Sequence, residues 1–247
     1  MAKYYNQNDY DYVPYPSPEL PRATVKSGGC GVCCGAMIVS SMASQTVDPE
    51  AMAAYSIAIG ARVSGGTDMN TLADAICRDY GLSCETTSDE NNLLEHLKDG
   101  GMAIANVGGD RDGWTGVFSN GGHFVVVAEY NGYTVAIMDP AYYSGKFSLA
   151  GRSGKVIVNG DLCYCNVEVL ADDTANRSPA YWLFKKGDDD MPEGALEAKI
   201  NIGGKEYPAY ALGGHVYFGQ GVQVKEFIDQ LPKTTDWRGN EMTLYIK

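Results

Sequence analysis

The chain has 247 residues, of which 45% are hydrophobic and 20% charged, a composition suited to a sizeable core and unlike that of a disordered protein. Its 19 basic and 31 acidic residues give a formal net charge of −12. Phosphate backbones and anionic lipids repel such a protein, so the charge argues against nucleic-acid binding and polybasic membrane docking. No segment has the roughly 18 consecutive apolar residues of a membrane-spanning helix, so no membrane insertion is expected.

The first half of the chain predicts helices. Residues 1–26 contain four prolines and no hydrophobic period, which predicts an extended arm without the apolar stretch of a signal peptide. We therefore expect synthesis in the cytoplasm without a secretion signal. After a turn at 27–29, N-cap and stop residues delimit predicted helices at 35–43, 51–59, from 67 or 68 to 80, and 93–98.

The hydrophobic period then changes from that of a helix to that of a strand. Short runs rich in Val and Ile predict strands at 102–107, 123–130, 133–138, 155–158, 163–169 and 181–184. Asn131-Gly132 predicts a two-residue hairpin turn between the second and third of these strands. Helices followed by an antiparallel sheet form an α+β arrangement, and we assign the resulting domain to residues 1–186.

A charged stretch with Gly and Pro, 187–194, is the best candidate linker. Beyond it, residues 195–247 predict a small α+β module with strands at 196–202, 207–212, 216–218 and 242–246 and a helix at 222–231. A module of about 50 residues has little core of its own. We therefore expect it to dock on the main domain or on a partner.

Seven cysteines in a chain without a secretion signal are expected to be free thiols. Cys30, Cys33, Cys163 and Cys165 could together supply thiolates for a zinc ion. The last two, however, lie two apart in a predicted strand, where small buried thiols are common. We therefore expect no metal site.

Cys30 is the candidate nucleophile. Two glycines precede it and an apolar helix follows, so its sulfur is expected near a helix N-terminus, where thiolate is favoured over thiol. Cys33 and Cys34 lie one turn further into the helix, where burial raises the pKa of a thiol. They are the structural residues of this group.

His123 is the candidate partner of this thiol, whereas His96 and His215 are expected to be structural. It follows two glycines and begins a predicted strand, so its ring is fixed by the sheet. A thiolate beside an imidazole can attack a carbonyl carbon and then protonate the leaving amine. The two-residue hairpin pairs His123 with position 140, which places the carboxylate of Asp139 beside the ring to orient it.

An oxyanion requires hydrogen-bond donors. The backbone N–H of Cys30 is one candidate. A side-chain amide from the N-terminal arm is the other, and physical reasoning does not distinguish Gln7 from Asn6 or Asn8.

Short motifs in chain order resemble those of the C39-like cysteine peptidases, which have a papain-like fold: Tyr4-Tyr5-Asn6-Gln7, Ser27-Gly28-Gly29-Cys30-Gly31, Gly121-Gly122-His123-Phe124-Val125-Val126 and Met138-Asp139-Pro140. The resemblance covers residues 3–185. It implies Gln7 as oxyanion donor, Cys30 as nucleophile, His123 as general base and acid, and Asp139 as the residue that orients the imidazole. An extra Gly before Cys30 and the run Val32-Cys33-Cys34 depart from the family pattern, so Cys33 and Cys34 remain alternatives to Cys30.

The C-terminal stretch, residues 200–246, resembles the copper amine oxidase N-terminal-like module of Gram-positive surface and phage proteins. Despite its name, this module implies no copper site, and no cofactor is expected. The resemblance implies contact with a cell wall or a partner through residues 195–247.

These residues together predict a cysteine hydrolase that cleaves an amide bond. The leading hypothesis is a phage-type peptidoglycan hydrolase, an endopeptidase or an amidase, that acts at the cell wall after release. The alternatives are a peptidase with protein or leader-peptide substrates and a catalytically dead binding protein of the same fold. Trp114 and Tyr142, on segments near the His and Asp motifs, are candidate substrate-binding residues.

Overall fold

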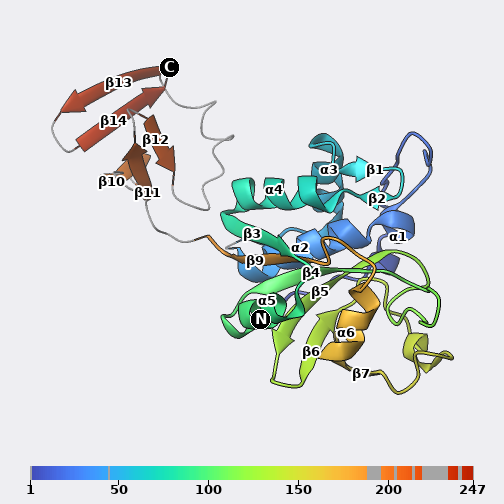
Figure 1. The fold of residues 1–247 in the computed structure, drawn as a ribbon. Helices are drawn as coiled ribbons and strands as arrows, with labels where there is room; N and C mark the ends of the chain where they lie inside the picture. The colour runs from blue at the N-terminus through green and yellow to red at the C-terminus, as the bar shows by residue number, and fades with distance from the viewer. Residues whose placement is uncertain are drawn as a thin grey trace. The chain divides into compact units, whose positions relative to one another are not determined.

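The computed structural model describes residues 2–43, 45–187, 196–202, 205–212, 215–218, 233–238 and 241–246 (Figure 1). The chain divides into two compact units, Met1–Gly187 and Asp188–Lys247. Of the predicted linker 187–194, only Gly187 belongs to the described residues. The predicted helix 222–231 lies outside them as well.

The first unit is built on a seven-stranded antiparallel sheet with the order β3-β9-β4-β5-β6-β8-β7. Its strands are β3 (Leu82–Thr87), β4 (Met102–Val107), β5 (His123–Tyr130), β6 (Thr134–Met138), β7 (Val156–Asn159), β8 (Leu162–Asn166) and β9 (Tyr181–Lys186). The α-helices are α1 (Val25–Gly28), α2 (Cys30–Met42), α3 (Pro49–Ala58), α4 (Met69–Tyr80), α5 (Glu90–Lys98) and α6 (Val167–Thr174). Two 3₁₀ turns, η1 (Gln7–Asp9) and η2 (Lys146–Ser148), and a small hairpin of β1 (Arg62–Val63) and β2 (Gly66–Thr67) complete it. The prediction of helices combined with an antiparallel sheet is confirmed.

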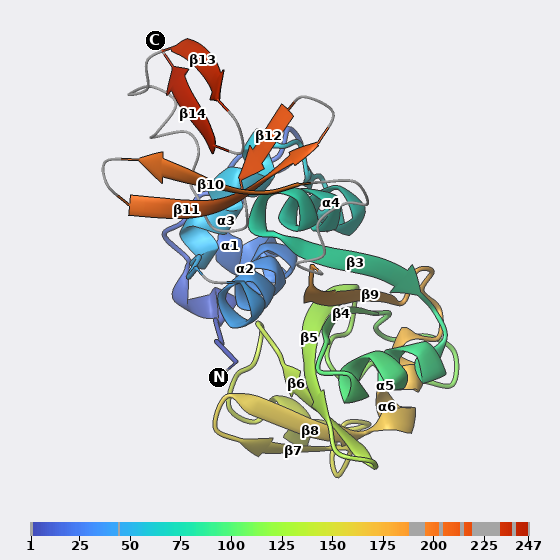
Figure 2. The same cartoon turned by 90° about the vertical axis from the view of Figure 1, so that its left-hand side faces the viewer.

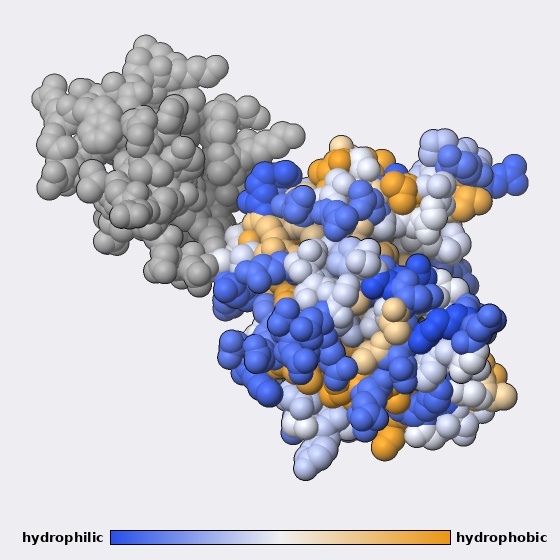
Figure 3. All heavy atoms as spheres, viewed as in Figure 1, coloured by the Kyte–Doolittle hydropathy of each residue, from blue (hydrophilic) through white to orange (hydrophobic). Residues whose placement is uncertain are grey.

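The sheet separates two hydrophobic layers, because side chains alternate between its faces. On β5, Phe124 and Val126 pack with the cluster around α2, while Val125 and Val127 pack with the cluster under α5 and α6. Figure 2 shows α2 on one side of β5 and α5 on the other. On the face in Figure 3, hydrophilic side chains cover most of the first unit, with hydrophobic ones in smaller patches.

Side-chain caps begin the helices where the sequence predicts them. Asp48 accepts a hydrogen bond from Ala51 N before α3, and Asp68 and Asp89 cap α4 and α5. Gly81 ends α4 with a φ of 65°, a left-handed conformation that glycine adopts without strain. These local signals position α2 and α4 against the sheet.

The structure corrects two expectations about these elements and adds one strand that was not predicted. The arm 1–26 is not simply extended, since it contains η1 and the start of α1 and buries Tyr15 completely. The predicted strand 163–169 ends at Asn166, whose side chain accepts a hydrogen bond from Glu168 N and begins α6. Strand β3 was not predicted because its residues are mostly polar and only half-buried at the sheet edge.

The β5–β6 hairpin also differs from its predicted register. Val126 pairs with Met138, and the register shifts by one more residue between Val127 and Glu129. Residues 131–133 separate the two strands, so the loop is one residue longer than predicted. The side chain of Asn131 accepts hydrogen bonds from the backbone N–H groups of Tyr133 and Thr134 within this loop. Paired residues therefore stop at Met138, and Asp139 follows directly after the ladder.

The second unit contains two small antiparallel sheets. One has the order β10-β11-β12, with β10 (Leu196–Ile202), β11 (Lys205–Leu212) and β12 (His215–Phe218). The other pairs β13 (Lys233–Arg238) with β14 (Glu241–Ile246). Strand β13 was not predicted from the sequence.

In the described part of the chain, no helix is long and apolar enough to cross a bilayer.

Candidate active site

Cys30 is the first residue of α2, directly after Gly29, and its side chain is partly exposed. The imidazole of His123 lies close enough to the thiol to lower its pKa, and the backbone N–H groups of Phe124 and Gly31 act in the same direction. Gly31 has to be a glycine here, because a Cβ would lie 2.6 Å from the Thr67 side chain. The β1–β2 hairpin thus packs closely against the first turn of α2, next to Cys30.

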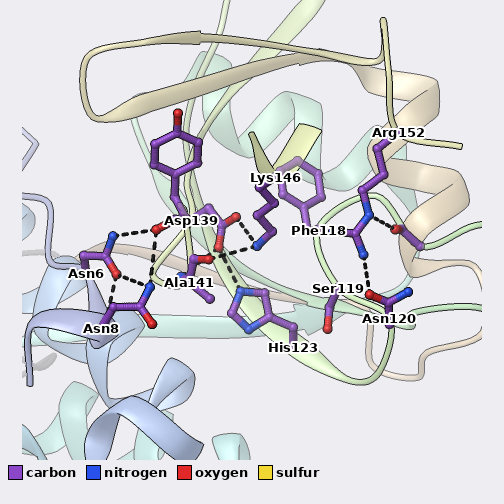
Figure 4. A network of polar contacts seen from close by, with 12 residues as sticks. Asn6, Asn8, Phe118, Ser119, Asn120, His123, Asp139, Ala141, Lys146 and Arg152 are labelled. Carbon is purple, nitrogen blue, oxygen red and sulfur yellow. Dashed lines mark hydrogen bonds and ion pairs between the residues drawn. The ribbon is translucent and has the colours of Figure 1, made fainter. Parts of the chain in front are cut away.

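His123 and Asp139 form the second contact of the site. The Nε2 atom of His123 lies 2.9 Å from Oδ1 of Asp139, and both side chains are buried (Figure 4). Because Nε2 is engaged by the carboxylate, Nδ1 is the ring nitrogen left for the thiol. The structure therefore brings together Cys30, His123 and Asp139, although the predicted hairpin register was wrong.

Asp139 has further partners that the sequence did not suggest. The Nζ atom of Lys146 lies 2.6 Å from Oδ2 of Asp139, and this lysine is only 3% exposed. The backbone N–H of Ala141 donates to Oδ1, and the phenol of Tyr4 donates to the Asp139 carbonyl. Nothing in the sequence distinguishes Lys146 from a solvent-exposed lysine in a loop, so it was missed.

The charges of this cluster support one another. Burial disfavours ionisation of the Cys30 thiol, but the hydrogen bond and charge of His123 outweigh it and lower the pKa of Cys30. Burial likewise disfavours the imidazolium, yet hydrogen bonds to Asp139 and Cys30 raise the pKa of His123 to about 9. Burial opposes ionisation of Asp139 too, but His123 and Lys146 hold its pKa below the usual value. The favoured state is therefore a thiolate–imidazolium pair beside a carboxylate.

The N-terminal arm connects the two sides of the site. The backbone N–H of Gln7 donates to the Pro140 carbonyl at 2.7 Å, and its side-chain Nε2 donates to the Lys26 carbonyl at 2.8 Å. Gln7 therefore links the segment before Cys30 to the segment after Asp139. Asn6 and Asn8 instead donate to the Tyr142 carbonyl. The structure thus distinguishes Gln7 from its amide neighbours, which sequence reasoning from physical grounds did not.

The two predicted substrate-binding aromatics lie in different surroundings. Tyr142 stacks on Phe147 with ring centroids 6.0 Å apart, and its backbone N–H donates to the Asp139 carbonyl. Trp114 donates from its indole to Asp173, and Lys155 lies 4.0 Å from its ring centroid. Tyr142 is therefore adjacent to the cluster, whereas the contacts of Trp114 within the described chain are with other residues.

A buried polar network orders the loop that leads into His123. The carboxylate of Asp173 is completely buried and accepts hydrogen bonds from Trp114 Nε1 and from the backbone N–H groups of Val117 and Phe118. Arg152, also buried, donates to the Gly116 carbonyl and to the side chain of Asn120 (Figure 4). These contacts give the segment before His123 a defined course.

The remaining cysteines and histidines lie outside this cluster. Cys33 and Cys34 are completely buried on α2, and Cys163 and Cys165 are buried on one face of β8. In the part of the chain that the structure describes, no group of three or more His, Cys, Asp or Glu residues could hold a metal ion. The ring of His96 contacts the Phe184 carbonyl at 2.8 Å, and His215 begins β12.

Comparisons with known proteins add little to this geometry. No protein-family model matches the chain, residues 195–247 included, and no curated protein matches it. Among solved structures, the chain is similar to one from Bacillus anthracis that is assigned only provisionally as a C39-like peptidase. The two share 16% identity at a TM-score of 0.44, and the match covers 71% of this chain and 96% of the other.

Proposed function

We propose that the protein is a cysteine hydrolase that cleaves an amide bond, with a papain-like arrangement of Cys30, His123 and Asp139. The observation that carries this proposal is the placement of the His123 imidazole, which contacts the buried carboxylate of Asp139 at 2.9 Å and lies close enough to the Cys30 thiol to lower its pKa. Such an arrangement supplies a nucleophile, a proton carrier and a group that orients the carrier.

In the proposed reaction the Cys30 thiolate attacks the carbonyl carbon of the scissile bond. His123 gives its proton to the departing amine nitrogen, the C–N bond breaks, and an acyl group remains on the sulfur. Water then attacks the thioester while His123 accepts one of its protons. The C–S bond breaks, and the carboxylic acid and the thiolate are released.

The charge on the tetrahedral oxygen requires donors near the N-terminus of α2. The backbone N–H of Cys30 is one, and the Gln7 amide, held beside Lys26, is the other. Asp139 keeps the imidazole in the orientation in which Nδ1 faces the sulfur. Lys146 and the N–H of Ala141 occupy the remaining acceptor positions of that carboxylate.

For the substrate we propose the peptide portion of peptidoglycan, cut either between amino acids or at the amide that joins peptide to glycan. The resemblance of residues 200–246 to a module of surface and phage proteins supports this choice. With a net charge of −12, the protein gains no electrostatic attraction to anionic wall polymers. Binding to the wall is therefore assigned to specific contacts of residues 195–247.

Digestion of purified sacculi tests this proposal. The parent protein is expected to release new amino termini, identified by mass spectrometry, and Cys30→Ala is expected to release none. Cys84→Ser, which removes a partly exposed thiol on β3, serves as the matched control and should digest like the parent. Release of the same termini by Cys30→Ala would refute the assignment of the nucleophile.

A parallel assay separates wall substrates from protein substrates. If unfolded casein is cut and sacculi are not, the cysteine hydrolase stands and the peptidoglycan assignment fails. If neither is cut and Cys30 alkylates like an ordinary thiol, the chain is a binding protein of this fold.

A further inference from the structure

A second thiol lies one helical turn from the candidate nucleophile and has no part in the proposed hydrolysis. Cys30 and Cys33 are separated by Gly31 and Val32 on the first turn of α2. Residues three apart on a helix are neighbours on its surface. Cys30 is partly exposed, whereas Cys33 is completely buried. The pair therefore combines one partly exposed residue with one that is completely buried.

The two thiols also differ in their ionisation. The pKa of Cys30 is lowered, because the contribution of His123 outweighs that of burial, so this sulfur is the nucleophilic one. Burial, followed by the charge of Cys30, raises the pKa of Cys33 well above its ordinary value. Cys-x-x-Cys pairs at helix N-termini with one activated thiol are typical of reversible dithiol–disulfide chemistry.

We propose that Cys30 and Cys33 form a redox pair in which a peroxide oxidises Cys30 and Cys33 closes a disulfide with it. The disulfide removes the thiolate and protects it from irreversible oxidation until a thiol reductant reopens it. The consequence for catalysis rests on the proposed function. The thiol chemistry itself does not.

Formation of the disulfide requires peroxide as its only oxidant. The Cys30 thiolate attacks one peroxide oxygen, the O–O bond breaks, and the products are a sulfenic acid and, after protonation, water or an alcohol. The Cys33 sulfur then attacks the Cys30 sulfur, so that an S–S bond forms as the S–O bond breaks. The departing hydroxide takes the Cys33 proton and leaves as water. Two equivalents of an external thiol return both residues to the reduced state.

Cys33 is the nearer of the two buried thiols on α2. In an ideal helix, Cα atoms three residues apart are separated by about 5 Å and those four apart by about 6 Å. Disulfides join Cα atoms 4.4–6.8 Å apart. Cys34, which is equally buried, follows one position later on the same helix. It is thus the matched control for Cys33.

The experiment uses the full chain, hydrogen peroxide and mass spectrometry. Trypsin cuts after Lys26 and Arg62 and nowhere between them, so residues 27–62 form one peptide with all three cysteines of α2. Cys77 and Cys84 fall on other peptides. After brief oxidation and alkylation in denaturant, fragmentation of this peptide in the parent should show alkyl groups on Cys34 only. Reduction before alkylation should restore all three.

Variants identify the resolving thiol. Cys34→Ser is expected to close and reopen the disulfide as the parent does. Cys33→Ser is expected to form none, to react at Cys30 with the sulfenic-acid reagent dimedone, and to lose Cys30 alkylation irreversibly on longer exposure. Absence of the disulfide in the parent, or its loss in Cys34→Ser and not in Cys33→Ser, would overturn the proposal. The parent measurement decides the matter even where a variant does not fold.

Failure of this inference is distinguishable from failure of the proposed function. A reversible disulfide in a protein that digests neither sacculi nor casein leaves the redox pair and removes the hydrolase. If the protein digests either substrate but its Cys30 oxidises without forming a disulfide, the hydrolase stands and the redox pair fails.

Discussion

At the scale of single residues, the site depends on one carboxylate that pairs with two cationic side chains. Asp139 contacts the imidazole of His123 through Oδ1 and the ammonium of Lys146 through Oδ2, and all three side chains are buried. Buried charges are tolerated only when they are paired and hydrogen-bonded. Lys146 therefore keeps Asp139 ionised. It also neutralises part of the carboxylate charge, which limits how far Asp139 raises the pKa of His123.

Removal of Lys146 tests its effect on the pKa of His123. In Lys146→Met, the imidazolium of His123 faces a carboxylate that no other cation neutralises, so its pKa is expected to rise above about 9. An NMR titration of the ring protons measures this, since the chain has only three histidines. The free energy of unfolding in urea should fall by about 3–5 kcal/mol, because Asp139 loses a buried partner.

The matched control is Lys98→Met, which removes an exposed lysine of α5. It should change neither quantity by much. An unchanged pKa of His123 in Lys146→Met would show that this lysine has a purely structural role.

Gln7 provides a second test at this scale. If its amide stabilises the oxyanion, Gln7→Ala should lower kcat on a cleaved peptide by roughly 10²–10³-fold. Alkylation of Cys30 by iodoacetamide should change little, because that reaction forms no oxyanion. Asn8→Ala, which removes a neighbouring amide of η1, should leave kcat near that of the parent. Equal effects of the two variants would contradict the role of Gln7.

At the scale of elements, the site is assembled from segments that are distant in the sequence. The thiol comes from the start of α2, the imidazole from the start of β5, and the carboxylate from the end of β6. The arm around Gln7 joins the first and last of these through Lys26 and Pro140. The carboxylate of Asp173 on α6 orders the loop before β5 by accepting hydrogen bonds from its backbone.

Asp173→Ala tests the contribution of that loop. The substitution leaves the indole N–H of Trp114 and two backbone N–H groups without their buried acceptor. Each unsatisfied donor costs about 1–3 kcal/mol, so the unfolding free energy should fall by roughly 3 kcal/mol or more. The His123 ring should also show broader or shifted NMR signals, since the loop leads directly into this residue. A stability close to that of the parent would contradict the account of the loop.

The elements that could be predicted from the sequence are those with strong local signals. Helices are capped as predicted by Asp48, Asp68 and Asp89. The Val-rich strand begins at His123, directly after two glycines, also as predicted. Local signals failed where tertiary context decides: β3 is polar and forms because β9 pairs with it, and α6 interrupts a run that reads as one strand.

The site shows the same limit of sequence reasoning. The candidate residues Cys30, His123 and Asp139 could be selected from local context and resemblance, and the structure brings them together. Lys146 could not, because its function depends on the fold returning it to a carboxylate seven residues earlier. The bulge in β5 likewise left no clear signal in the sequence, although it changes the register of the hairpin.

At the scale of the whole molecule, the residues of the candidate site all belong to the unit Met1–Gly187. This unit contains both hydrophobic clusters, whose members lie between Tyr5 and Phe184. A chain that ends at Gly187 is therefore expected to fold and to retain the reactivity of Cys30 toward iodoacetamide. In a pull-down with sacculi it should lose most of the binding of the full chain. Undiminished binding would remove residues 195–247 from the account of wall recognition.

The central claim is that the imidazole of His123 activates the thiol of Cys30, and the pH dependence of alkylation tests it most directly. Rates of iodoacetamide incorporation are measured on the peptide 27–62, so that each thiol is resolved. For the parent, Cys30 should react as a thiolate well below the ordinary thiol pKa of about 8.5. In His123→Ala only the backbone N–H groups of Phe124 and Gly31 still oppose the effect of burial on the pKa of Cys30, so the midpoint should rise to about 8.5 or above. The same midpoint in both proteins would contradict the account.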